Sequence, residues 1–217
     1  MTALRALLAA LLLSPIMMST GARAQGWSLP PADYKYQPAE ACIDDPVRAS
    51  KPLRPGGAVY ALCEDQMALA AKAIEQARKE GKLLIVTVGA AWCPWCAALQ
   101  RLMYGPEFFE RKGDQIDYRK TFNHIEIGIA TTYKGKNAII PSGVAVERNL
   151  RARSGGVEIK SIPFIMVLDP TQPSRVIARN SMEISDLATG QQDMGRFRKL
   201  IQDAHAELKG QRRAAVR

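Results

Sequence analysis

Apolar residues recur at helical spacing between residues 65 and 80 of the 217-residue chain, with polar residues on the opposite side. This spacing predicts an amphipathic helix that starts at an acidic residue, Asp65, and stops at Gly81. Residues 83–88 form a short apolar run, which predicts a central strand covered on both faces. A second helix is expected over 94–103, because Pro94 suits the first helical turn, where a missing N–H costs nothing.

The second half of the chain alternates between strand and helix patterns. Three isoleucines at 125, 127 and 129 alternate with Glu126 and Gly128, which predicts a strand at 125–129. The other expected elements are a short helix at 107–111, a loop at 131–143, a helix at 144–153, a strand at 164–168, a turn at 169–174, a strand at 175–179 and a helix over 194–208 that ends at Lys209 and Gly210. This order predicts an α/β domain with helices on both faces of a mixed central sheet.

The N-terminus has the three-part pattern of a secretory signal peptide over residues 1–24. A basic residue, Arg5, precedes an apolar stretch, and small residues end the pattern before Gln25, where we expect cleavage. The apolar stretch is short for a membrane span, which takes roughly 20 residues. We therefore expect a periplasmic or secreted protein.

Residues 25–58 are rich in proline and have no sustained period, so they predict an irregular N-terminal extension. The expected domain organisation is a signal peptide at 1–24, the extension at 25–58, one domain at 59–210 and a basic tail at 211–217.

The chain is basic, with a formal net charge of +9 that falls by two when Arg5 and Arg23 leave with the leader. The charge is spread out, without the clustered stripe and reading element that nucleic-acid binding needs. It therefore indicates either a solvated surface or a basic face that attracts acidic partners or anionic lipid. No Gly-rich phosphate loop follows any expected strand, so we expect no bound nucleotide. We also expect no other cofactor, no nucleic-acid partner and a monomeric protein.

Residues 92–96, Trp-Cys-Pro-Trp-Cys, follow the expected central strand and open the expected helix. This context places Cys93 at a helix N-terminus, where unpaired N–H groups and the helix dipole favour a thiolate. Cys96 lies about one turn further along and can close a disulfide with Cys93. Redox exchange, an inert bridge and a metal site are the three interpretations of such a pair.

The other two cysteines, Cys42 and Cys63, straddle the second half of the extension. Four cysteines in an oxidising compartment allow three pairings, and the sequence does not choose between them. A structural disulfide that pins the extension to the domain is one interpretation of Cys42 and Cys63. A second redox pair that relays electrons to or from the Cys93 pair is the other.

Two separated motifs resemble the thioredoxin superfamily, in particular its exported bacterial thioredoxin-like branch. They are residues 89–96, Gly-Ala-Ala-Trp-Cys-Pro-Trp-Cys, and residues 161–165, Ser-Ile-Pro-Phe-Ile. The resemblance spans roughly residues 60–209 and implies a thioredoxin-like fold. It casts Pro163 as a cis-proline opposite the disulfide and Ile162 as its substrate-facing neighbour.

The sequence departs from that family at two positions beside the cysteines. Thr87 stands where the family often has a buried Asp that moves the proton of the second cysteine, so another group or water must do this here. The dipeptide Pro94-Trp95 differs from the Gly-Pro of typical thioredoxins and is closer to the Pro-aromatic pair of glutaredoxins.

These features predict a thiol-disulfide oxidoreductase in which Cys93 attacks a protein disulfide and Cys96 resolves the mixed disulfide. We expect Cys93 to be exposed and Cys96 to be shielded, with Trp92 and Trp95 forming an apolar rim for substrate. Ile162 before Pro163 resembles the thioredoxin version of that loop, which favours a reductase. The family then implies a membrane-embedded thiol electron donor.

The two histidines, His124 and His205, are each expected to have ordinary structural roles. His124 together with the thiols of Cys93 and Cys96 gives an alternative of another class. In that alternative the chain is a periplasmic copper-binding or copper-delivery protein.

Overall fold

The computed structural model describes residues 29–45, 58–105, 108, 116–172, 175–186 and 191–215. Within them, five strands form one sheet in the order β3-β2-β1-β4-β5. The strands are β1 (Leu83–Ala90), β2 (Phe122–Tyr133), β3 (Lys136–Ile139), β4 (Phe164–Leu168) and β5 (Val176–Asn180). β2 runs parallel to β1, and the other neighbouring strands are antiparallel. The mixed α/β architecture agrees with the sequence prediction and is consistent with a thioredoxin-like fold.

The helices alternate with the strands along most of the described chain. They are α1 (Glu40–Asp44), α3 (Gln66–Lys79), α4 (Pro94–Tyr104), α6 (Tyr118–Thr121), α7 (Pro141–Arg153), the 3-10 helix η1 (Ser181–Glu183) and α8 (Met194–Ala215). Two short strands, β6 (Ser185–Asp186) and β7 (Gln191–Gln192), pair between η1 and α8.

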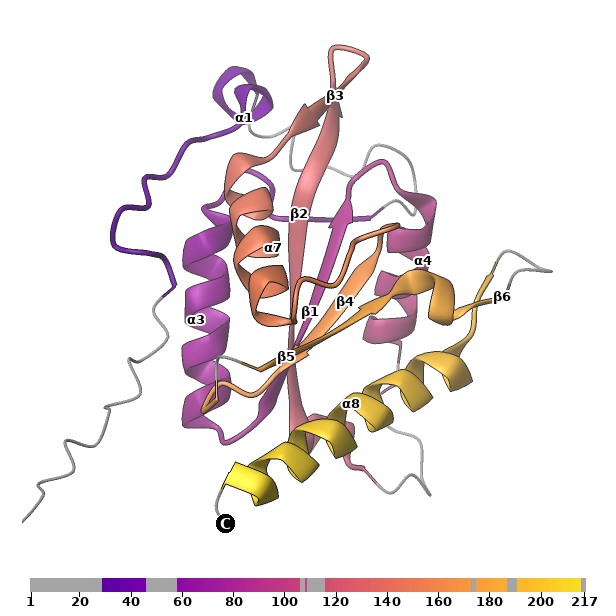
Figure 1. Cartoon of the computed structure of the whole chain (residues 1–217). Helices are drawn as coiled ribbons and strands as arrows, with labels where there is room; N and C mark the ends of the chain where they lie inside the picture. The colour runs from indigo at the N-terminus through magenta and orange to yellow at the C-terminus, as the bar shows by residue number, and fades with distance from the viewer. Residues whose placement is uncertain are drawn as a thin grey trace, which may run out of the picture.

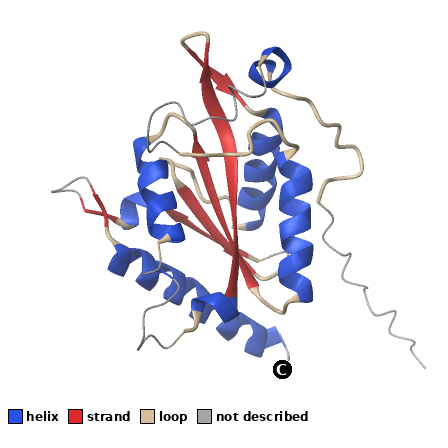
Figure 2. Cartoon of the chain, turned by 180° about the vertical axis from the view of Figure 1, so that it is seen from behind, coloured by secondary structure: helices blue, strands red, loops and turns tan. Residues whose placement is uncertain are grey.

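Helices cover both faces of the sheet. α3 and α7 lie side by side on one face, and α4 and α8 pack on the other (Figure 1). The view from behind shows the strands enclosed between these two helical layers (Figure 2). All eight residues of β1 are buried, because this strand lies at the centre of the sheet and is covered on both sides.

The ends of α3 lie where the sequence pattern predicts them. The Asp65 carboxylate accepts hydrogen bonds from the backbone N–H groups of Met67 and Ala68, at 2.9 and 3.3 Å, and so caps the helix. Gly81 follows the helix with a φ of +66°, a conformation that glycine adopts without strain.

The prediction of a loop at 131–143 is wrong. β2 continues to Tyr133, a hairpin turn leads into β3, and α7 begins at Pro141. The turn residues Lys134 and Gly135 have φ values of 49° and 74°, the positive pair that a two-residue hairpin turn with right-handed twist requires. The strand predicted at 125–129 is therefore the middle of a longer one, which also contains His124.

Two further differences concern the ends of the chain. α8 does not end at Gly210 but continues to Ala215, since an exposed glycine weakens a helix by about 1 kcal/mol without breaking it. The extension contains α1, which lies beside the β2–β3 turn, where Lys134 forms an ion pair of 2.9 Å with Asp44 (Figure 1).

Several predicted segments lie outside the described residues. These are the signal peptide at 1–24, the prolines of 46–57 and, apart from Phe108, the short helix at 107–111. Among the helices that are described, none combines the length and the apolar character needed to cross a membrane.

Candidate active site

The Cys-x-x-Cys segment joins the end of β1 to the start of α4. Cys93 is the N-cap residue of α4 and Pro94 occupies the first turn. The backbone N–H of Cys96 donates to Cys93 Sγ at 3.1 Å. This hydrogen bond and the positive end of the helix dipole both stabilise negative charge on the first sulfur.

Cys93 and Cys96 form a disulfide, with their Cα atoms 5.3 Å apart. The expectation that Cys93 is exposed is wrong for this oxidised form, because Cys93 is 2% exposed and Cys96 is 1% exposed. The physical reason is the loop before β4, whose Ile162 carbonyl oxygen lies 3.7 Å from Cys93 Sγ and helps to cover it.

That loop contains a cis peptide bond between Ile162 and Pro163. Pro163 is buried and Ile162 is half-buried, at the point where the chain enters β4. β4 pairs with β1, with Phe164 opposite Val88, so this pairing carries the loop to the end of β1 that leads into the cysteine pair.

Trp92 precedes Cys93 and Trp95 precedes Cys96, and both tryptophans remain exposed. Trp92 is 39% exposed and Trp95 is 38% exposed, although large aromatic side chains gain most from burial. Together they present apolar surface next to a buried disulfide in the chain.

Cys42 and Cys63 form the other disulfide, with Cα atoms 5.2 Å apart. It joins α1 to the segment immediately before α3. Cys42 packs in the same apolar cluster as Cys93 and Cys96, and Cys63 packs against that cluster. The bond therefore attaches the extension beside the Cys93 pair.

A partly buried carboxyl group, which the sequence pattern does not single out, lies beneath α4. Glu126 on β2 accepts a hydrogen bond of 2.6 Å from Gln100 Nε2, one turn after Cys96 in α4. Burial raises the pKa of Glu126 to about 8, against the opposing effect of its bonds to Gln100 and Tyr104. The sequence pattern alternates Glu126 with isoleucines, which indicates a solvent-facing residue, whereas α4 covers this side of β2.

Tyr60 also lies at this place and was not singled out from the sequence. Its ring is buried, and both burial and the neighbouring Glu126 raise the pKa of its hydroxyl. A Cβ atom added at Gly89 would lie 2.8 Å from Cys96 Sγ and closer still to Tyr60 Oη. The hydroxyl and the second sulfur thus border the same small space over β1.

The hydroxyl of Thr87, at the position where the resembled family often has an acid, contacts His124. Thr87 Oγ1 and His124 Nε2 are 3.1 Å apart. Burial lowers the pKa of His124 to about 4, so its ring is neutral at pH 7. His205 lies on α8, where its ring meets Phe122 edge-on at a centroid distance of 5.8 Å.

The copper alternative needs His124 together with both thiols. Across the residues that the structure describes, no three His, Cys, Asp or Glu side chains come together as a metal site requires. The contact of His124 with Thr87 leaves that alternative without a specific observation in its favour.

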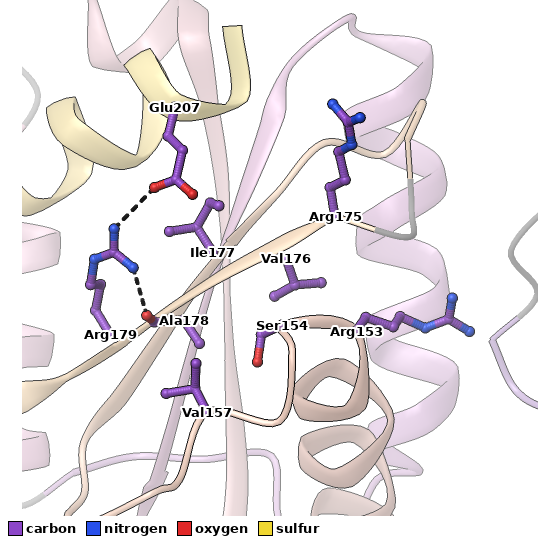
Figure 3. Close-up of a pocket in the computed structure, with 9 residues that line it drawn as sticks. All are labelled: Arg153, Ser154, Val157, Arg175, Val176, Ile177, Ala178, Arg179 and Glu207. Carbon is purple, nitrogen blue, oxygen red and sulfur yellow. Dashed lines mark hydrogen bonds and ion pairs between the residues drawn. The ribbon is translucent and has the colours of Figure 1, made fainter. Parts of the chain in front are cut away.

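A pocket between α7, β5 and α8 is separate from the cysteines (Figure 3). It includes Val176, which pairs with Leu168 at the end of β4 far from the cis-proline. Arg179 in this pocket donates to Glu207 at 3.1 Å and to the Ala178 carbonyl at 2.9 Å. Figure 3 shows Arg153 and Arg175 on the opposite side of the pocket from Arg179, so the three cations do not converge.

Comparisons with known proteins do not identify the function of this site. No family model matches the chain, and no curated protein matches it. Among solved structures, the crystal structure of a disulphide isomerase from Xylella fastidiosa Temecula1 is similar over 52% of this chain and 71% of that chain, with 16% sequence identity and a TM-score of 0.35. A TM-score this low carries no inference about fold or function, so the function has to be inferred from the residues of the site themselves.

Proposed function

We propose that the protein is an exported, thioredoxin-like thiol-disulfide oxidoreductase that acts on protein disulfides through Cys93 and Cys96. The observation that carries this proposal is the Cys93–Cys96 disulfide at the start of α4, with the cis Ile162–Pro163 loop against its first sulfur. An inert structural bridge would gain nothing from a helix N-cap that stabilises a thiolate.

In the proposed reaction, the thiolate of Cys93 attacks one sulfur of a substrate disulfide and forms a mixed disulfide. The substrate's other sulfur leaves as a thiolate. Cys96 then loses its proton and attacks Cys93 Sγ, which releases the second substrate sulfur. Two electrons pass from the Cys93–Cys96 dithiol to the substrate, and the pair ends oxidised.

Protein segments are the proposed substrates. Trp92 and Trp95 offer exposed apolar surface beside the disulfide, which suits an extended chain that lies across it.

We further propose that the protein works as a reductase in the periplasm or outside the cell, and that a membrane-embedded thiol protein supplies its electrons. Ile162 before Pro163 supports the reductase direction through its resemblance to thioredoxins. The leader-like pattern at 1–24 supports export.

The test is the equilibrium of the Cys93–Cys96 couple with glutathione, followed by acid quenching, alkylation and mass mapping of each cysteine. A reductase should have a potential nearer to about −270 mV than to about −120 mV, the values of thioredoxin and of a strong oxidant. The C96S variant should trap partners as mixed disulfides at Cys93, and the C93S variant should trap none. A pair that fails to exchange with glutathione or with any protein disulfide contradicts the proposed function.

A further inference from the structure

The strand β5 forms one edge of the sheet. It pairs with β4 on one side, and among the described strands none pairs with its other side. The pocket between α7, β5 and α8 is lined by every residue from 175 to 179 (Figure 3). Because successive side chains of a strand point to opposite faces of a sheet, five consecutive residues can line one hollow only where it opens along the edge. The pocket is therefore a groove along the open edge of β5.

Two hydrogen bonds indicate which backbone groups of β5 point away from β4. Arg179 Nη1 donates to the Ala178 carbonyl oxygen at 2.9 Å, and the Asn180 N–H donates to a carboxylate oxygen of Glu183 at 3.2 Å. Residues two apart in an antiparallel strand send their backbone groups to the same side. The N–H groups of Val176 and Ala178 and the carbonyl of Val176 therefore point outward too. An extended chain that joins a sheet edge bonds to groups of this kind.

Basic side chains border the groove. Arg153 and Arg175 lie on the side opposite to Arg179, and Arg179 is paired with Glu207 at 3.1 Å (Figure 3). Arg175 has a buried Nη1 atom with no hydrogen-bond acceptor among the residues that the structure describes. A buried N–H without an acceptor is costly, and a guanidinium forms its strongest hydrogen bonds with carboxylates. Arg175 therefore gains from a carboxylate that enters the groove.

Arg153 favours a ligand of the same charge. Its Nε donates to Asn149, a neutral side chain, at 3.0 Å, and burial lowers the pKa of its guanidinium. A positive charge that burial destabilises is stabilised by a negative charge nearby. Since the arginines around the groove do not converge on one point, a single small anion does not reach them all. Carboxylates spaced along an extended chain can do so.

We propose that the open edge of β5 binds an extended acidic segment of a partner protein, which adds a strand to the sheet beside Val176. Alternate side chains of the added strand point to opposite sides of the sheet. Acidic residues on one side then meet Arg153 and Arg175, and apolar residues on the other side face Ile177, which packs with α8. The groove is separate from the cysteines, so this surface is additional to the proposed redox function and does not rest on it.

The charges favour an acidic partner over a second copy of this chain. Two copies joined antiparallel about Val176 would bring the Arg175 side chains of both copies close together, and like charges on neighbouring strands destabilise their pairing. The backbone favours a peptide over a lipid surface, because lipid headgroups supply no strand to the outward groups of Val176 and Ala178.

The test is a fluorescence anisotropy titration of the full-length protein with a labelled peptide of sequence Val-Glu-Val-Glu-Val-Glu-Val. One control peptide has Lys in place of each Glu, and another has Pro in place of the central Glu, which removes an N–H that an added strand uses. We expect both control peptides to bind at least about tenfold more weakly than the acidic peptide. R175Q and R153Q should each weaken binding of the acidic peptide about tenfold, as loss of a hydrogen bond to a charged group does.

R148Q is the matched control, because Arg148 is an exposed arginine of α7 that does not line the pocket, and it should bind like the wild type. A thermal melt checks that each variant is folded. The bound peptide should also slow amide hydrogen exchange at Val176 and Ala178. The proposal is overturned by equal binding of the acidic and Lys peptides, by wild-type affinity in both R175Q and R153Q, or by unchanged exchange at these two amides.

Two further measurements distinguish the other occupants of the groove. Sedimentation equilibrium detects a dimer, and co-sedimentation with phosphatidylglycerol vesicles detects lipid binding. We expect neither to depend on Arg175. A dimer or vesicle binding that R175Q abolishes would assign the groove to a second copy or to lipid, and would overturn the proposal. Exchange of the Cys93 pair with glutathione should be the same in R175Q and the wild type, because the groove lies away from the cysteines.

Discussion

Gly89 of β1 and Gly128 of β2 are register partners in the parallel pair, and one segment of chain lies across both. A Cβ at Gly89 would meet Tyr60 Oη and Cys96 Sγ, and a Cβ at Gly128 would meet Leu62 and the Cβ of Tyr60. Two adjacent residues without side chains thus make room for residues 58–62 against the sheet. As a result, a segment that precedes the domain's first long helix becomes part of the cysteine site.

The G89A variant should be destabilised by about 1–3 kcal/mol, the usual cost of adding a methyl group to a packed site. It should also displace the Tyr60 hydroxyl and Cys96 Sγ, which border the added methyl group. Urea unfolding measures the loss of stability. G210A is the control, since among the described residues no atom outside the local helix lies within 4 Å of that added Cβ, and alanine favours an exposed helix. Equal stability of G89A and wild type would contradict the described packing.

The sequence pattern predicted the helices and strands whose apolar residues face the core. The buried run at 83–88 and the periodic stripe after Asp65 both became the elements that their patterns indicate. These positions face the core, where apolar spacing and secondary structure have the same physical cause. The fold class followed from their order.

The sequence pattern did not predict features that depend on packing against a segment distant in the sequence. Glu126 follows the alternation of a half-exposed strand, and only the packing of α4 across β2 buries it. Burial of Cys93 likewise depends on the Ile162 loop, almost 70 residues away, at a contact of 3.7 Å. The β2–β3 hairpin is different, because its turn is local: Gly135 suits a positive φ, but Lys134 before it does not give the Asn-Gly or Asp-Gly pattern that indicates such a turn.

Replacing both Cys42 and Cys63 by serine should lower the free energy of unfolding by about 3 kcal/mol, since the disulfide closes a loop with a sequence separation of 21. If the bond is structural, the potential of the Cys93 pair should remain that of the wild type. Denaturant unfolding and glutathione equilibration measure these quantities. A changed potential, or exchange between the two disulfides during turnover, would assign Cys42 and Cys63 a relay role instead.

The W95A variant should bind protein substrates less tightly while keeping its thiol chemistry. Trp95 is 38% exposed beside the cysteines, so its removal takes away contact surface without opening the core. We expect KM for a protein disulfide to rise about tenfold, which corresponds to roughly 1.4 kcal/mol. The rate with oxidised glutathione, too small to span the rim, should stay constant and serves as the control. A parallel loss with both substrates would show that Trp95 acts on the chemistry.

His124 should make the protein sensitive to mild acid. Its pKa is lowered by burial from 6.5 to about 4, so the unfolded chain binds a proton more readily than the folded one. The stability contributed by His124 is therefore present above about pH 6.5 and is lost as the pH falls through about 4. Urea unfolding at several pH values should show a smaller loss for H124Q than for the wild type. An H124Q slope equal to that of the wild type would contradict the prediction.

Glu126 should act on stability in the opposite direction, at alkaline pH. Its pKa rises from 4.5 to about 8 on folding, so the folded protein holds a proton that the unfolded chain releases. The stabilising effect of that proton is complete below about pH 4.5 and disappears as the pH rises through about 8. The wild type should therefore lose stability between pH 5 and pH 9, and E126Q, which cannot ionise, should lose less. Urea unfolding across this range measures the difference, with E158Q, which removes an exposed carboxylate, as the control. Coincident curves for E126Q and wild type would contradict the raised pKa of Glu126.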